Sequence, residues 1–178
     1  MKTYKIDSSK ISEYTKRNDN RVFKILAITM VAMPFLMFPV LKQERAPKEV
    51  ITIYIFSFAF TALIVGLIYL NNKKLTRLTA ENLQIVVDDH SITRVIDLDN
   101  EPRLNFFHRM AYDRVKNISG GYYAKVDFDN IKSIEKKSGD LWVKATNSNA
   151  FNGKNIVLIP RELTNFDDIE KELNNRRK

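Results

Sequence analysis

Two long apolar segments limit what this chain can fold into. Residues 22–41 carry Lys24 as their only charge, and residues 50–70 carry no charge. A helix of about 20 residues is roughly 30 Å long, which matches the hydrocarbon core of a bilayer. Neither segment has the polar face of a helix from a soluble domain. The pattern predicts a transmembrane helical hairpin over residues 22–70, with spans at about 22–41 and 50–70.

The rest of the chain divides into a polar N-terminal segment, residues 1–21, and a domain at residues 79–178. We expect the N-terminal segment to be either a short surface helix around residues 8–16 or loose chain. About 100 residues are enough to form one small hydrophobic core. The chain has no cysteine, which excludes disulfides, thiolate zinc sites and cysteine nucleophiles.

The net charge of +8 could suggest nucleic acid, but much of the excess flanks the apolar segments. Basic residues cluster at residues 16–24, before the first segment, and at residues 73–77, after the second. Lysine and arginine beside membrane spans favour the cytoplasmic side. We therefore predict a multi-pass protein of the cell membrane with both termini in the cytoplasm and no nucleic-acid partner. With no ionisable residue deep in either span, the pattern argues against a channel or transporter made of this chain alone.

Beyond residue 79 the pattern changes to short β-rich runs separated by turn residues. It predicts strands at residues 83–87, 92–98, 122–128, 131–136, 141–146 and 156–159, and a C-terminal helix with Phe166, Ile169 and Leu173 buried. One stretch, residues 103–118, has helical periodicity instead. Its expected buried stripe is Leu104, Phe107, Ala111, Val115 and Ile118.

Three short motifs carry a resemblance to a known family: residues 128–131 (FDNI), 138–141 (SGDL) and 156–161 (IVLIPR). With the preceding hairpin, this chain resembles the small bacterial membrane proteins in which two transmembrane helices precede a PH-like domain, as in YcxB-like proteins. The resemblance implies an α+β fold: a PH-like antiparallel β-barrel or sandwich closed by a C-terminal capping helix. The helix at residues 103–118 departs from that pattern as an insertion. The family supplies no catalytic residues.

Acidic residues offer the only candidates for metal chemistry. Asp88, Asp89 and His90 are adjacent, and Asp97/Asp99 and Asp127/Asp129 form two Asp-x-Asp pairs whose carboxylates would share a face of a strand. A turn explains the first group more simply, and no phosphate-binding glycine loop accompanies the pairs. His108 has no second ligand at metal-binding spacing. We predict no catalytic residue, no metal and no cofactor.

Basic residues give the better candidate surfaces. Lys73, Lys74 and Arg77 follow the second span directly, so we expect them to contact lipid headgroups. Arg109, Arg114 and Lys116 would form a surface for a partner or for lipid if the helix at residues 103–118 lay on the membrane. The alternative, which we favour, is that this helix packs on the barrel through its apolar stripe.

The sequence thus favours a membrane-anchored, non-enzymatic binding or regulatory module. It is integral to the lipid bilayer, and its cytoplasmic domain contacts a protein partner or the membrane surface, for instance through sheet edges. Two alternatives remain. One is an accessory or immunity-type subunit of a membrane complex that acts through its hairpin. The other is a metal-dependent transferase that uses an Asp-x-Asp pair.

Overall fold

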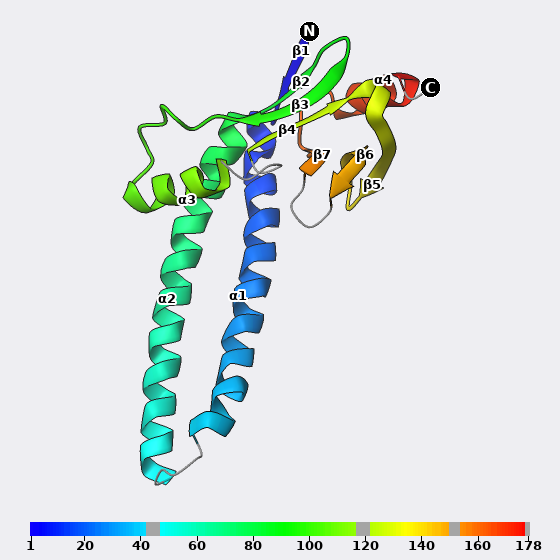
Figure 1. Cartoon of the computed structure of the whole chain (residues 1–178). Coiled ribbons are helices and arrows are strands. Elements are labelled where there is room, and N and C mark those ends of the chain that lie inside the picture. The colour runs from blue at the N-terminus through cyan, green and yellow to red at the C-terminus, as the bar shows by residue number, and fades with distance from the viewer. Residues whose placement is uncertain (42–46, 117–121, 150–153, 177–178) are drawn as a thin grey trace. The chain divides into compact units, whose positions relative to one another are not determined.

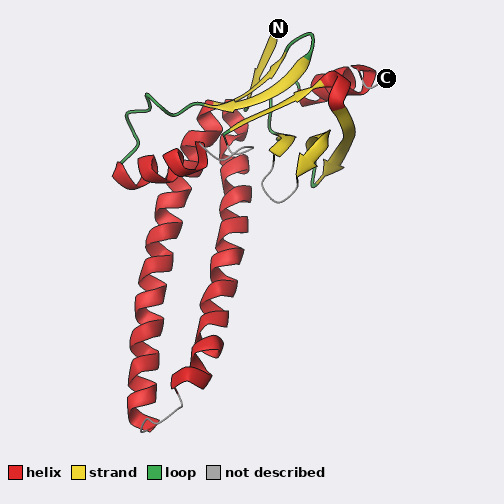
Figure 2. Ribbon diagram, in the orientation of Figure 1, coloured by secondary structure: helices red, strands yellow, loops and turns green. Residues whose placement is uncertain are grey.

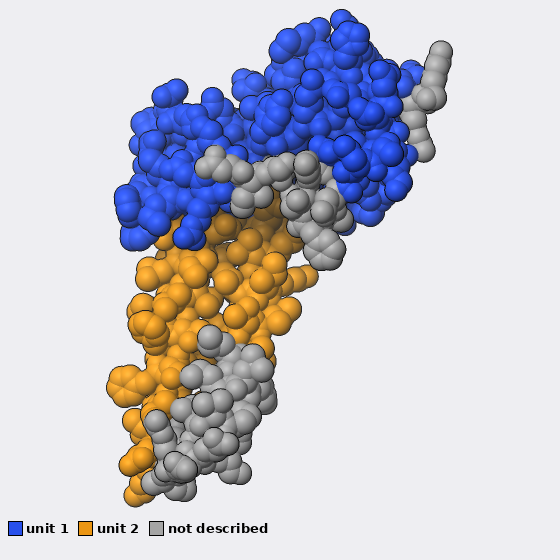
Figure 3. Space-filling view, in the orientation of Figure 1, with its two compact units in different colours: residues 1–15, 75–178 blue, residues 16–74 orange. Residues whose placement is uncertain are grey.

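The computed structural model describes residues 1–41, 47–116, 122–149 and 154–176. These form two compact units (Figure 3). A globular unit combines Met1–Thr15 with Leu75–Lys178, and a helical unit consists of Lys16–Lys74. This division differs from the predicted one, because the first residues of the chain belong to the globular unit instead of forming a separate segment.

Two long helices, α1 (Ile11–Leu41) and α2 (Pro47–Asn82), contain the apolar segments (Figures 1 and 2). Large apolar side chains such as Ile28, Phe56 and Phe60 are exposed along them, and the rings of Phe23 and Tyr69 meet edge-to-face at 5.8 Å. Within the described residues, α2 alone is long and apolar enough to cross a membrane. Of the residues between the two predicted spans, 42–49, residues 47–49 belong to α2 and residues 42–46 lie outside the described residues.

The globular unit contains two antiparallel sheets, which confirms the α+β class. One has the order β1-β2-β3-β4 and the other the order β5-β6-β7. Strands β3 and β4 of the first sheet pack against β6 and β7 of the second. The described strands do not close into a barrel, so the barrel form of the prediction is wrong. The strands are Lys2–Lys5, Leu83–Val87, Ser91–Ile96, Tyr123–Asp127, Ile131–Lys137, Asp140–Asn149 and Lys154–Ile159.

The first strand, β1, is the element that the sequence did not predict. It pairs with β2 in a register that sets Tyr4 opposite Ile85, and both side chains are buried. The chain then reaches α1 through a short 3-10 turn, Ser8–Lys10. Main-chain bonds from Thr164 N–H to Lys5 O and from Asp7 N–H to the residue 162 carbonyl, both 2.9 Å, tie it to the segment before the last helix. Strand β1 is therefore held by its pairing with β2 and, at its C-terminal end, by bonds to residues 162–164.

The remaining strands begin and end within a few residues of their predicted positions, and β2 matches exactly over its five residues. The predicted turn between β5 and β6 is a two-residue loop, in which Ser138 and Gly139 both have positive φ, 54° and 87°. That geometry belongs to the tight type I′ hairpin turn, in which glycine is favoured. The short polar run Ser-Gly-Asp thus fixes the hairpin and its register.

The C-terminal helix α4 (Phe166–Arg176) closes the core, as predicted, through Ile169 and Leu173. The helix predicted at residues 103–118 is also present, as α3 (Phe106–Lys116). Near the end of α2, Leu78 and Ala80 are buried in the same core. The largest fully buried side chains of the globular unit are Leu83, Ile85, Ile92, Leu98, Leu141, Ile159, Leu163, Ile169 and Leu173.

Candidate functional site

Helix α3 begins at a reciprocal cap. The Asn105 side-chain oxygen accepts a hydrogen bond from the His108 N–H at 2.8 Å. In return, the Asn105 N–H donates to Nδ1 of His108 at 3.4 Å. This resembles the capping box that starts many helices, with histidine in the place of glutamate. The start of α3 is therefore set locally by two polar side chains.

One face of α3 packs on the globular core through His108 and Tyr112, which are each 2% exposed. The Tyr112 hydroxyl accepts a hydrogen bond from the Leu98 N–H at 3.1 Å, and burial raises the pKa of this hydroxyl. The Tyr112 ring lies 5.0 Å from that of Tyr122. Residues four apart share a helix face, so these two side chains define which side of α3 points inward.

The predicted buried stripe is wrong in its largest member. Phe107 is 66% exposed, and its neighbours Phe106 and Met110 are 72% and 46% exposed. Leu104, Ala111 and Val115 are half-buried, and residue 118 lies outside the described residues. The helix does pack on the core, as favoured, but it is rotated from the expected orientation. Two amphipathic side chains take the inward positions, which leaves three large apolar ones outside.

The three basic residues predicted on this helix do not act together. Lys116 forms an ion pair with Asp99 and lies 5.6 Å from the centre of the Tyr112 ring. Arg109 donates to the main-chain oxygen of Asp99 at 3.4 Å. The bond from Lys116 lowers the pKa of the Asp99 carboxyl. Arg109 and Lys116 are thus turned toward the loop before α3, whereas Arg114 is exposed elsewhere on the helix.

An ion-pair network ties the loop before α3 to the end of α2. Arg103 binds Glu101 through two nitrogens, at 2.6 and 2.8 Å, and reaches Glu81 at 2.7 Å. Asn82 also donates to Glu101, at 3.4 Å. The bonds from Arg103 lower the pKa of Glu101 to about 2. Charge-assisted, bidentate contacts of this kind fix geometry as well as adding energy, so α3 is fastened to the last turn of α2.

The predicted headgroup residues lie further back on α2. Lys73, Lys74 and Arg77 are exposed, and Arg77 pairs with Glu81 at 3.0 Å. Lys73 and Lys74 lie in the helical unit, and Arg77 lies in the globular unit. Their contact with lipid headgroups remains a prediction.

The acidic candidates have structural roles. The Asp88 carboxylate accepts from His90 N–H, Ser91 N–H and the Ser91 hydroxyl at 2.6–2.8 Å. These bonds, that from His90 first, lower the pKa of Asp88. This is the local side-chain-to-backbone bonding by which aspartate forms turns.

Neither Asp-x-Asp pair lies on the face of one strand, so that expectation is wrong. Asp97 and Asp99 follow β3 in a loop, where the Asp97 carboxylate accepts from the Asp99 N–H at 2.9 Å. Asp127 ends β4, and Asp129 belongs to a 3-10 turn, Phe128–Asn130. Among the residues that the structure describes, no three His, Asp or Glu side chains are grouped to hold a metal ion.

A second candidate surface is the edge of β1 around Thr3, since the edge beyond it is already bonded to residues 162–164. A shallow polar groove lies between this edge and α4. The Lys5 carbonyl points away from β2, toward Thr164. In an antiparallel strand, every second residue directs its N–H and C=O to the same side. The N–H and C=O of Thr3 therefore also point away from β2. The groove is lined by Lys2, Thr3, Tyr4, Thr164, Asn165, Asp168, Lys171, Glu172, Asn175 and Arg176.

Comparison with protein-family models, with curated proteins and with solved structures finds no match to this chain.

The rotation of α3 predicts opposite effects for two substitutions in the full-length protein in detergent. Tyr112→Phe removes the acceptor of a buried N–H, which typically costs about 1–3 kcal/mol, so the melting temperature should fall clearly. Phe107→Ala removes a ring that is 66% exposed and should leave it nearly unchanged. The reverse order in thermal denaturation would show that Phe107, and not Tyr112, faces the core.

The Glu101 network predicts a pH-dependent contribution to stability. The pKa of this carboxyl is about 2 in the folded protein, against an ordinary value of 4.5. Its stabilising effect is therefore complete above about pH 4.5 and is lost as the pH falls toward 2. Glu101→Gln should lower the melting temperature at pH 7 and have a smaller effect at pH 3. An equal loss at both values would mean that Glu101 is not bound in this way.

Proposed function

We propose that this protein is a membrane-anchored, non-enzymatic binding module whose globular unit, of the PH-like type, is held at the cytoplasmic face by a two-helix anchor. The pairing of β1 with β2 carries the proposal. These strands lie on either side of the helical unit in the sequence and share one sheet, so they must lie on the same side of a membrane. The chain between them therefore crosses an even number of times. Helix α2 is long and apolar enough to cross, and we therefore propose that α1 crosses with it.

The continuity of α2 supports anchoring close to the bilayer. Its apolar segment ends at Leu70, and Leu78 and Ala80 of the same helix are buried in the globular core. No loop separates the apolar segment from the buried end of α2. The basic residues Lys73, Lys74 and Arg77 all lie between Leu70 and Leu78. Such residues favour the cytoplasmic side and anionic headgroups.

The β1 edge supports binding of a protein partner. An exposed edge can accept an added strand from an extended segment, with main-chain hydrogen bonds supplying the affinity. Lys2 and Lys5 occupy this short strand, and pairing with a second copy would bring the lysines of the two strands close together, which is unfavourable. We therefore assign the edge to an extended segment of another protein, bound between β1 and α4.

The proposed topology is tested by labelling single cysteines in intact cells with an impermeant thiol reagent. The chain has no cysteine of its own, so Ser8→Cys, Gln43→Cys and Ser148→Cys each report one position. Gln43→Cys should react, and Ser8→Cys and Ser148→Cys should react only after the cells are permeabilised. Labelling of Ser8→Cys and Ser148→Cys without Gln43→Cys would reverse the orientation. Labelling of only one of Ser8→Cys and Ser148→Cys would refute the even number of crossings.

Strand addition at β1 is tested by a photo-crosslinking residue at Lys171, in the α4 wall of the groove. In native membranes it should form an adduct that Thr3→Pro abolishes. Proline removes the outward N–H and spares the β1–β2 ladder, because proline is tolerated on an edge. Thr3→Val, which keeps the N–H, should preserve the adduct. An adduct that survives Thr3→Pro would rule out strand addition, and adducts formed only from the apolar helices would favour the accessory-subunit alternative.

A further inference from the structure

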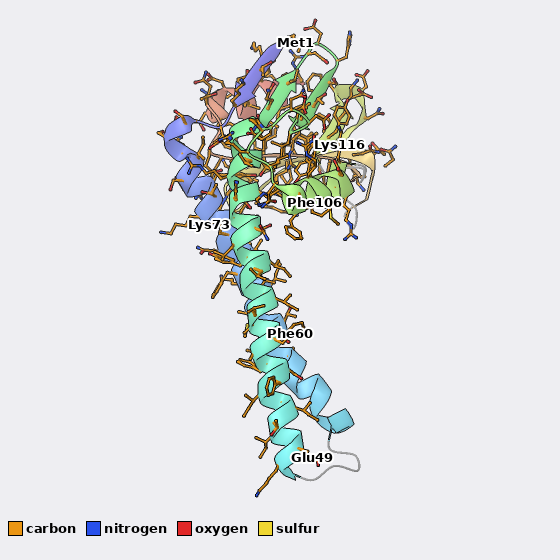
Figure 4. All side chains as sticks on the ribbon, turned by 90° about the vertical axis from the view of Figure 1, so that its left-hand side faces the viewer. Met1, Glu49, Phe60, Lys73, Phe106 and Lys116 are labelled. Atoms are coloured by element: carbon orange, nitrogen blue, oxygen red, sulfur yellow. The ribbon has the colours of Figure 1, made fainter. Side chains whose placement is uncertain are left out.

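The outward surface of α3 divides into two flanks. At about 100° per residue, Phe106, Met110, Arg114 and Phe107 share one arc of the helix circumference. Arg109, Asp113 and Lys116 share the neighbouring arc, where Arg109 and Lys116 contact Asp99. Figure 4 labels Phe106 at the start of α3 and Lys116 at its end. One flank is thus polar and engaged within the protein, and the other is apolar with a single arginine.

The apolar flank is costly to leave in water. Phe106, Phe107 and Met110 are 72%, 66% and 46% exposed, and the two rings contact each other edge-to-face at 5.7 Å. Packing does not explain these positions, because His108 and Tyr112 make the inward contacts. A helix with an apolar flank edged by basic residues is the form that lies in the interface of a membrane.

The chain itself indicates what covers this flank. The loop directly before α3 is bound to Glu81 through Arg103. Glu81 lies on the same continuous helix as Leu70, the end of the apolar segment. Eleven residues of helix span about 16 Å at 1.5 Å per residue, so the attachment point of α3 cannot be further than this from the hydrocarbon. The headgroup layer takes up roughly 6 Å of this distance, and the remainder is about the 10 Å thickness of a helix with its side chains. Helix α3 is therefore close enough to reach the headgroups.

The charge on α3 selects the kind of lipid. The helix carries Arg109, Arg114 and Lys116 against one acidic residue, Asp113. Arg109 and Lys116 are engaged with Asp99, which leaves Arg114, beside the apolar flank, as the cation that can reach a phosphate. A basic residue near an anionic surface is worth about fivefold in binding.

We propose that the apolar flank of α3, formed by Phe106, Phe107 and Met110, inserts into the headgroup interface of the anionic membrane that anchors the chain, with Arg114 on the lipid phosphates. The inference rests on the proposed membrane anchorage. It makes α3 a second contact with the same leaflet, attached to the end of α2 and independent of the β1 edge.

The test uses the full chain in nanodiscs of neutral lipid, with or without anionic lipid, and spin labels on single cysteines. With anionic lipid, the ratio of oxygen to aqueous nickel collisions at Met110→Cys should be several-fold higher than at Arg109→Cys, which lies about 100° around the helix. Equal, water-like ratios at the two positions would overturn the proposal. Protection of Met110→Cys from both reagents would also overturn it, because the flank would then be buried against protein.

Two further variants test the membrane anchorage and the phosphate contact separately from the insertion of α3. Phe60→Cys, in the apolar part of α2, should be accessible to oxygen. If it is not, the anchorage itself fails, whereas an accessible Phe60→Cys with a water-exposed Met110→Cys refutes only the insertion of α3. Arg114→Gln should lower the ratio of inserted to free label at Met110→Cys about fivefold with anionic lipid and leave it unchanged in neutral lipid. An equal effect in both would remove the role given to the phosphate contact.

Discussion

The hydrogen bonding between β1 and β2 is the constraint on which the rest of the structure depends. It joins residues 2–5 to a strand that begins at Leu83. The whole helical unit is therefore a segment inserted between two neighbouring strands of one sheet. Tyr4 of this strand and Ile6, which follows it, are both buried, so this part of the chain contributes to the core. In the proposed membrane protein both strands must lie on the same side of the bilayer, and this limits the topology more strongly than the hydropathy of either helix.

Helix α3 shows how burial of polar groups and exposure of apolar ones can be coupled. Tyr112 is inside because its hydroxyl satisfies the Leu98 N–H, and His108 is inside with its ring nitrogen on the cap. Once these positions face the core, the helical repeat directs Phe106 and Phe107 outward. The Arg103 network then holds that orientation against the end of α2. The result is an apolar surface on α3 whose exposure to water costs free energy.

Much of the fold could be predicted from the sequence. Strand β2, the Ser138-Gly139 turn and the last helix follow from residue patterns that act locally. Strand β1 could not be predicted, because four residues with one buried side chain give no periodicity and the partner lies beyond the helical unit. The rotation of α3 was not predicted for another reason. A pattern based on apolar residues alone places Phe107 in the core, whereas the inward positions are occupied by His108 and Tyr112. The pair Asn105 and His108, at capping-box spacing, was the available signal.

The order of synthesis gives the first strand an additional consequence. Residues 2–5 leave the ribosome before either helix, yet their partner β2 follows both. In the proposed topology, β1 cannot pair with β2 until the second helix has crossed the membrane. Before that, the β1-facing edge of β2 is unpaired and Tyr4 is not in the core. In the proposed topology, a chain whose second helix fails to cross has β1 and β2 on opposite sides of the bilayer. In that topology the sheet is completed only in molecules whose two helices both cross the membrane, and in the others the β2 edge stays unpaired.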